Sequence, residues 1–264
     1  MKDSSRMVNF SVFFTSFSIL SYQIIFTRIF AWAQWHNLSP LIITMALLGF
    51  GASGSVVSVI QKKIENRYSQ FFFTGLILFP AFLTFGFILS TRLVFNPYEM
   101  AFSVGQIISM FLYFFLMGFS FFLGAVIICM ALLKYSVSKT YFFNLLGSGA
   151  GALAVVAASF LWHPFHVMMG IILIAMVPAL GMAFHDSVKY VLTAGTVTAV
   201  IIGTFFTCDL QVMLFPFSDF KKVSQYKAIS GALNLPDAQI VHEAYSPLAV
   251  VQVVQAKGLR TTAG

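Results

Sequence analysis

Charged residues are scarce in this chain. Asp, Glu, Lys and Arg make up only 9% of its 264 residues, whereas about a quarter of an ordinary soluble domain is charged. The sequence also lacks a pair of carboxylates within any apolar run, a Ser-His-Asp set and a Walker-type phosphate loop. The low content of charged residues excludes a water-soluble globule. The missing catalytic and phosphate-binding patterns give little support to catalysis by this chain alone.

Cysteine is equally scarce, and the two cysteines have no metal-binding spacing. Cys129 lies inside an apolar run and Cys208 lies at the end of another, so neither a ligand set nor a disulfide framework is expected. The net charge of +7 arises from 15 basic and 8 acidic residues, and most of the cations lie between apolar runs. This placement suits anionic lipid head groups. The sequence therefore predicts membrane lipids as partners, no nucleic acid, and no cofactor.

Apolar residues are abundant. They make up 59% of the chain and include 32 Phe. A membrane-spanning helix needs about 20 mainly apolar residues, and the uncharged runs of that length are approximately 8–30, 39–60, 70–91, 103–133, 141–162, 165–184 and 188–207. We therefore expect an all-α polytopic membrane protein with six to seven transmembrane helices over residues 1–208.

Two of these runs carry more specific expectations. The first follows Lys2 and Arg6 but is longer than the apolar region of a signal peptide, which favours a retained helix. The fourth is long enough to require a tilt or a break, with Gly118 and Gly124 as the weak points.

A short α+β tail is expected over residues 209–264. The stretch from Tyr226 to Leu233 is typical of a short helix, and Gln239 to Tyr245 and Val250 to Ala256 are rich in strand-forming residues. Ser246-Pro247-Leu248 joins these two strands. Such a tail has a thin core, because a lone hairpin is marginal in water.

The distribution of Lys and Arg predicts the orientation. If all seven runs span the membrane, Lys and Arg gather in the loops on the side of the N-terminus, and the positive-inside rule places that side in the cytoplasm. The tail then lies outside. It returns to the cytoplasm if one run is re-entrant.

Four polar residues within the apolar runs are candidates for an intramembrane polar site: Gln23, Arg28, Gln106 and Asn144. Polar groups in hydrocarbon are costly and usually face the protein interior. We expect Arg28 to point inward and to be paired with an amide oxygen, a backbone carbonyl or a lipid phosphate. The alternative is that the amides only bond neighbouring helices while Arg28 extends to the membrane surface.

Two clusters of small residues are expected at helix contacts. Residues 49–54 (GFGASG) match the G-x-G-x-x-G pattern of dinucleotide-binding folds, but they lie inside an apolar run without the strand that this pattern requires. Residues 147–151 (GSGAG) contain a G-x-x-x-G pattern. The positions predicted to pack against other helices are Gly49, Gly51, Gly54, Gly147 and Gly151.

Three histidines are candidate metal ligands. His163 and His166 are three residues apart, and His36 is expected on the same membrane side. Because no carboxylate or thiol accompanies them, interfacial histidines beside Trp35 and Trp162 are the favoured interpretation, and no metal site is predicted.

Several stretches resemble membrane-embedded spermidine-synthase-like proteins of bacteria. Residues 22–30 (YQIIFTRIF) are similar to the Y-E-x-x-x-T-R-x-F pattern of that family's first helix, and residues 42–54 (IITMALLGFGASG) are similar to its S-x-A-L-x-G-x-G helix. Residues 141–147 (YFFNLLG) resemble its Y-x-x-D-L-x-G helix, and the tail resembles the linker and first strands of its aminopropyltransferase-like domain. Gln23 and Asn144 stand where the family has Glu and Asp, so a role that needs a carboxylate is not carried over.

The resemblance implies a function. The domain that would bind S-adenosylmethionine or its decarboxylated form begins with a strand, a Gly-rich turn and an acidic residue, and none of this occurs up to Gly264. We therefore expect a bacterial inner-membrane module that is non-catalytic alone and that anchors or supplies a soluble transferase domain or split partner. The alternative is a small transporter or channel lined by the four polar residues.

Overall fold

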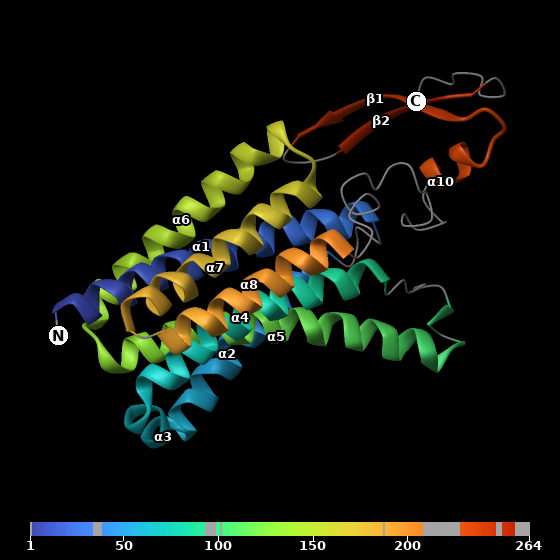
Figure 1. The fold of residues 1–264 in the computed structure, drawn as a ribbon. Coiled ribbons are helices and arrows are strands. Elements are labelled where there is room, and N and C mark those ends of the chain that lie inside the picture. Colours follow the sequence, from blue (N-terminus) through green and yellow to red (C-terminus); the bar gives the residue numbers. More distant parts are fainter. Residues whose placement is uncertain are drawn as a thin grey trace.

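The computed structural model describes residues 2–33, 39–92, 99–100, 102–186, 188–207, 228–246 and 250–256. These residues form a bundle of long helices followed by a short helix and two strands (Figure 1). The helices of the bundle are α1 (Lys2–Ala33), α2 (Pro40–Val59), α3 (Gln61–Asn66), α4 (Tyr68–Arg92), α5 (Val104–Lys134), α6 (Val137–Leu161), α7 (Pro164–Asp186) and α8 (Val188–Thr207). The fold is thus all-α and polytopic, with a small α+β tail.

Six of the described helices are long and apolar enough to cross a membrane, and α8 contains a shorter apolar segment at Leu192–Ile201. These helices coincide with the seven apolar runs, so the expected six to seven spans are confirmed by length and composition. The short helix α3 joins α2 to α4. Because the apolar helices follow one another through short connections, successive ones run in opposite directions.

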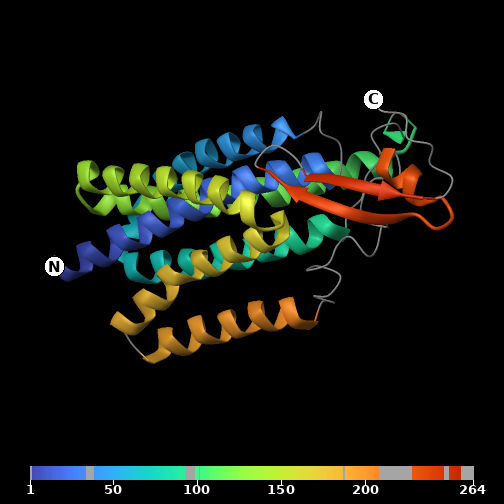
Figure 2. The same cartoon turned by 90° about the horizontal axis from the view of Figure 1, so that it is seen from above.

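Helix α1 is the central element of the bundle. It contacts α2, α5, α6 and α7, and Figure 2 shows α6 lying beside it. Large aromatic side chains fill the face of α1 towards α5: the Tyr22 and Phe121 ring centroids are 5.8 Å apart, and those of Phe30 and Tyr113 are 5.3 Å apart. Helix α1 is thus packed by four other helices.

Helices α2 and α6 lie at the periphery. Their buried residues form narrow stripes, which in α2 are Ile42, Ala46, Gly49, Ser53 and Val57. Large apolar side chains outside the stripes are exposed, as in Leu47 and Leu153. In a membrane these faces contact lipid.

For helix α5 the sequence predicts a tilt or a break, and the structure shows no break. It is continuous from Val104 to Lys134, with no break at Gly118 or Gly124. Both glycines instead allow other helices to approach: a Cβ on Gly124 would lie 2.6 Å from Ile19 Cδ1 and 2.9 Å from Phe79 Cε2. Packing on several sides stabilises the helix at these glycines, where helix propensity alone would weaken it.

The tail consists of α10 (Ala228–Leu233), β1 (Gln239–Tyr245) and β2 (Val250–Gln255). The strands pair antiparallel as a two-stranded sheet with a register irregularity between Ile240 and His242. The sheet lies at the end of the bundle away from the N-terminus (Figures 1 and 2), where β1 contacts α6. The expected boundary at residue 208, the start of the expected helix at Tyr226, and Pro247 and Leu248 lie outside the described residues.

Candidate functional site

The turn between α6 and α7 holds a group of polar and aromatic side chains. His163 immediately precedes α7, and Pro164 is the first residue of that helix, a position that tolerates the missing N–H of proline. The backbone N–H of Phe165 donates to His163 Nδ1 at 3.3 Å. The imidazole therefore caps α7 in the way that a Ser or Asn side chain caps other helices.

His163 is enclosed by aromatic rings. Only 4% of its surface is exposed, and its ring stacks on Phe165 with centroids 5.2 Å apart. Phe165 in turn packs against Phe87 of α4 at 5.6 Å. The exposed ring of His166 lies edge-on to His163 at 6.1 Å. These ring contacts join the turn to α4.

The surroundings keep His163 uncharged. Burial, followed by the nearby His166 and Arg28, lowers its pKa to about 3, because burial disfavours a charged ring and neighbouring positive charges disfavour another. At neutral pH the ring is therefore neutral. Since Nδ1 accepts the Phe165 N–H, the ring proton resides on Nε2.

Arg28 lies close to this turn. It is half-buried near the end of α1, and its charge acts on His163. The position agrees with an inward-facing side chain. However, its charge acts on an imidazole of the α6–α7 turn, which the sequence predicts to be an interfacial histidine and not a neighbour of Arg28. The signal that points to this group is the succession Trp162-His163-Pro164 between two apolar runs.

The four polar residues expected to form one site do not share a pocket. Ser16 of α1 donates to Asn144 Oδ1 at 2.7 Å, and Ser16 is twelve residues from Arg28, which is about 18 Å along a helix. Gln106 instead lies near the start of α5, where its Nε2 donates to Glu99 Oε2 at 3.3 Å. Gln23 is half-buried, and its backbone carbonyl accepts a bond from Thr27. Asn144 therefore lies at a different depth from Arg28, because twelve residues of α1 separate Ser16 from Arg28.

The glycines divide into two groups. A Cβ on Gly49 would lie 2.8 Å from the Gly118 carbonyl oxygen of α5, and one on Gly151 would lie 2.5 Å from the Phe17 carbonyl oxygen of α1. Gly147 is pressed equally closely against the Phe13 carbonyl oxygen. These three positions lie at helix contacts, as expected.

Gly51 and Gly54 do not pack, which corrects the expectation for them. A Cβ at either position would have no neighbour within 4 Å. At about 100° per residue they point away from the stripe that contains Gly49. Their role in helix contact is therefore excluded within the described residues.

No group of three or more His, Cys, Asp or Glu side chains suited to a metal occurs among the described residues. His36 and Cys208 lie outside them. The Arg28–His163–His166 cluster instead brings a guanidinium and two imidazoles to the end of the bundle at the α6–α7 turn. Comparisons with protein-family models, with characterised proteins and with solved structures find no match for this chain.

Proposed function

We propose that this chain is the membrane module of a spermidine-synthase-like system in the bacterial inner membrane. In this proposal the N-terminus is cytoplasmic, the chain alone is non-catalytic, and the module anchors or supplies a soluble transferase domain. The sequence resemblance motivates the proposal, and the small sheet at one end of the bundle is the main structural observation that supports it.

The sheet offers a surface for such a domain. Its two strands pair only with each other among the described residues, and two-stranded sheets are marginal without further packing. Val251 and Val253 lie two residues apart on β2, so they share a face, and 55% and 46% of their surfaces are exposed. An exposed apolar strand face favours coverage by additional structure.

The polar cluster lies at the same end of the molecule. The α6–α7 turn that holds His163 directly follows the end of α6, and β1 contacts α6. A domain seated on the sheet would therefore face the end of the bundle where Arg28 and His163 lie. This arrangement supports a module that presents a membrane-derived group to the domain.

The first test is genetic. The DNA that follows the codon of Gly264 is expected to encode a Gly-rich nucleotide-binding fold, either in the same frame or as a neighbouring gene. An unrelated sequence at that place argues for a different function.

The second test is biochemical and uses the transferase domain co-expressed with this chain. The domain is expected to remain in the membrane fraction, and aminopropyl transfer to a polyamine acceptor is expected only when the domain is present. Val251→Lys places a charge on the exposed sheet face and should release the domain, whereas Gln252→Lys, at a polar position on the opposite face of the same strand, should retain it. Retention that is independent of this chain contradicts the proposal.

A further inference from the structure

A second feature lies at the opposite end of the bundle, where α1 and α6 begin. A pocket of about 640 Å³ opens there between the two helices. Its polar lining consists of Ser5, Arg6, Asn9 and Lys139, and its apolar lining consists of four phenylalanines and Leu146. The volume falls in the usual range of small-molecule sites, about 300–1,000 Å³.

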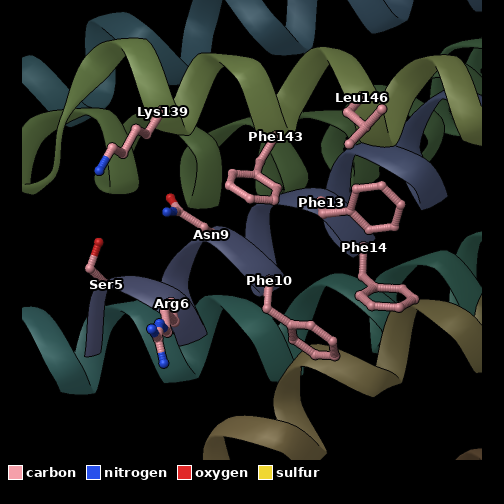
Figure 3. Close-up of a pocket in the computed structure, with 9 residues that line it drawn as sticks. All are labelled: Ser5, Arg6, Asn9, Phe10, Phe13, Phe14, Lys139, Phe143 and Leu146. Atoms are coloured by element: carbon pink, nitrogen blue, oxygen red, sulfur yellow. The ribbon is translucent and has the colours of Figure 1, made fainter. Parts of the chain in front are cut away.

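The lining of the pocket is polar at one end and apolar at the other. Figure 3 shows Ser5, Asn9 and Lys139 on one side and Phe13, Phe14 and Leu146 on the other. Phe13 follows Arg6 by seven residues and Leu146 follows Lys139 by seven, which places the apolar groups about 10 Å further along the parallel helices. The two cations lie within the first residues of their apolar spans.

The charge of the pocket is positive. Arg6 and Lys139 are both exposed, and no Asp or Glu is among the described side chains that line the cavity. At the level of lipid head groups, such a pair attracts a phosphate, because each cation gains from a nearby anion where water is partly excluded.

The side-chain oxygen of Asn9 is a buried acceptor in this pocket. Its side chain is only 8% exposed, and its buried Oδ1 has no hydrogen-bond partner among the described residues. Figure 3 shows the amide directed to the side where Ser5 and Lys139 lie. An acceptor that is buried without a donor destabilises the protein, so a ligand that brings a hydroxyl group would satisfy it.

We propose that this pocket binds an anionic glycerophospholipid with a hydroxyl-bearing head group. The phosphate lies between Arg6 and Lys139, and a head-group hydroxyl donates to Asn9 Oδ1. The first part of an acyl chain lies along the phenylalanines, whose apolar surface it removes from contact with the head groups. The proposal is independent of the transferase function, because the pocket and the sheet lie at opposite ends of the bundle.

The experiment measures lipid binding to the purified full chain by native mass spectrometry and by thermal shift. Phosphatidylglycerol is expected to bind more tightly than phosphatidylcholine. Arg6→Ala combined with Lys139→Ala should weaken phosphatidylglycerol binding by about fivefold for each charge removed. The matched control removes two exposed cations of α3, Lys62→Ala with Lys63→Ala, and should leave the affinity within about twofold.

Asn9→Leu tests the hydroxyl contact. This variant removes the unpartnered acceptor while keeping a similar volume, so it should fold, and it should lose the preference for phosphatidylglycerol over phosphatidic acid, which has no head-group alcohol. Glycerol 3-phosphate and inorganic phosphate serve as soluble probes and should give no shift, because they lack acyl chains.

Three results would overturn the proposal. Equal binding of phosphatidylglycerol and phosphatidylcholine would remove the role of charge, and equal losses in the pocket variant and the α3 control would show a non-specific surface effect. Binding of glycerol 3-phosphate as tight as that of the lipid would identify a soluble anion as the ligand.

Discussion

At the scale of single residues, His163 combines a structural and an electrostatic role. Its Nδ1 caps α7, while burial, His166 and Arg28 keep the ring neutral with a pKa of about 3. An ordinary unfolded histidine titrates near pH 6.5. Protonation therefore favours the unfolded chain, and the contribution of His163 to stability depends on pH.

We expect His163→Asn to flatten this dependence. Because the folded pKa lies below the unfolded one, the stabilisation is fully present above about pH 6.5 and is lost as the pH falls towards 3. Between pH 7 and pH 4.5 the wild type should lose about 2 kcal/mol through this residue, whereas asparagine keeps a capping acceptor without titrating. Thermal unfolding in detergent at the two pH values measures the difference.

His166→Asn is the control for this variant. His166 is exposed, and burial is the first cause of the His163 shift, so most of the pH dependence should remain. Equal slopes in the wild type and in His163→Asn would show that the imidazole is not buried as described.

The hydrogen bond between Ser16 and Asn144 supports a second prediction at this scale. It joins α1 to α6 at 2.7 Å, and such bonds within membrane bundles contribute about 0.6 kcal/mol on average and at most about 1.7 kcal/mol. A double-mutant cycle of Ser16→Ala and Asn144→Ala should give a coupling energy in this range. A coupling energy of zero would mean that the two groups do not bond in the membrane.

At the scale of elements, the contact of α6 with α1 depends on two glycines one turn apart. Gly147 and Gly151 lie against backbone atoms of α1, and the Ser21 hydroxyl donates to the Gly151 carbonyl oxygen at 2.9 Å. Backbone atoms cannot move aside as a flexible side chain can, so larger residues at these positions must separate the helices.

Gly147→Ala and Gly151→Ala are therefore expected to destabilise the bundle by about 1–3 kcal/mol each. Gly149→Ala is the matched control, since a Cβ there meets nothing within 4 Å, and alanine favours a helix over glycine by about 1 kcal/mol. Chemical denaturation of the detergent-solubilised protein should thus show losses for the first two variants and no loss for the third. A loss at Gly149 as large as at Gly151 would contradict close packing as the cause.

For these elements, sequence patterns predict the helices themselves and only some of the contacts between them. Hydropathy and length identify every long helix, because each apolar run satisfies a membrane-spanning requirement by itself. The G-x-x-x-G spacing also predicts the α6 contact, since residues 147 and 151 share a helix face. The same reasoning failed for Gly51 and Gly54, because composition indicates small residues without indicating which face of α2 meets α5.

At the scale of the whole molecule, the polar residues could not be grouped from the sequence. Their depth along each helix follows from residue number, but their neighbours depend on how the helices are arranged. Helix α6 packs beside α1 across more than a hundred intervening residues. This arrangement places Lys139 and Arg6 in the lining of one pocket and Asn144 at Ser16, while Arg28 lies near the α6–α7 turn. The long-range arrangement thus places Asn144 and Arg28, which were expected in one site, at different levels of the bundle.

The arrangement also predicts that α3 and the sheet lie on opposite sides of the membrane. This prediction requires α8 to cross as a seventh pass beside α1, α2, α4, α5, α6 and α7. The 20 residues of α8 extend about 30 Å, which matches the hydrocarbon thickness, although its described apolar segment is shorter. In a chain carrying Cys129→Ala and Cys208→Ala, single cysteines introduced by Lys63→Cys and Val241→Cys test this, because both positions are exposed. With the N-terminus in the cytoplasm, as proposed, a membrane-impermeant maleimide should label Val241→Cys in intact cells and label Lys63→Cys only after the membrane is opened. Labelling of both positions from the same side would show that one apolar helix does not cross, which would return the sheet and any domain seated on it to the side of the N-terminus.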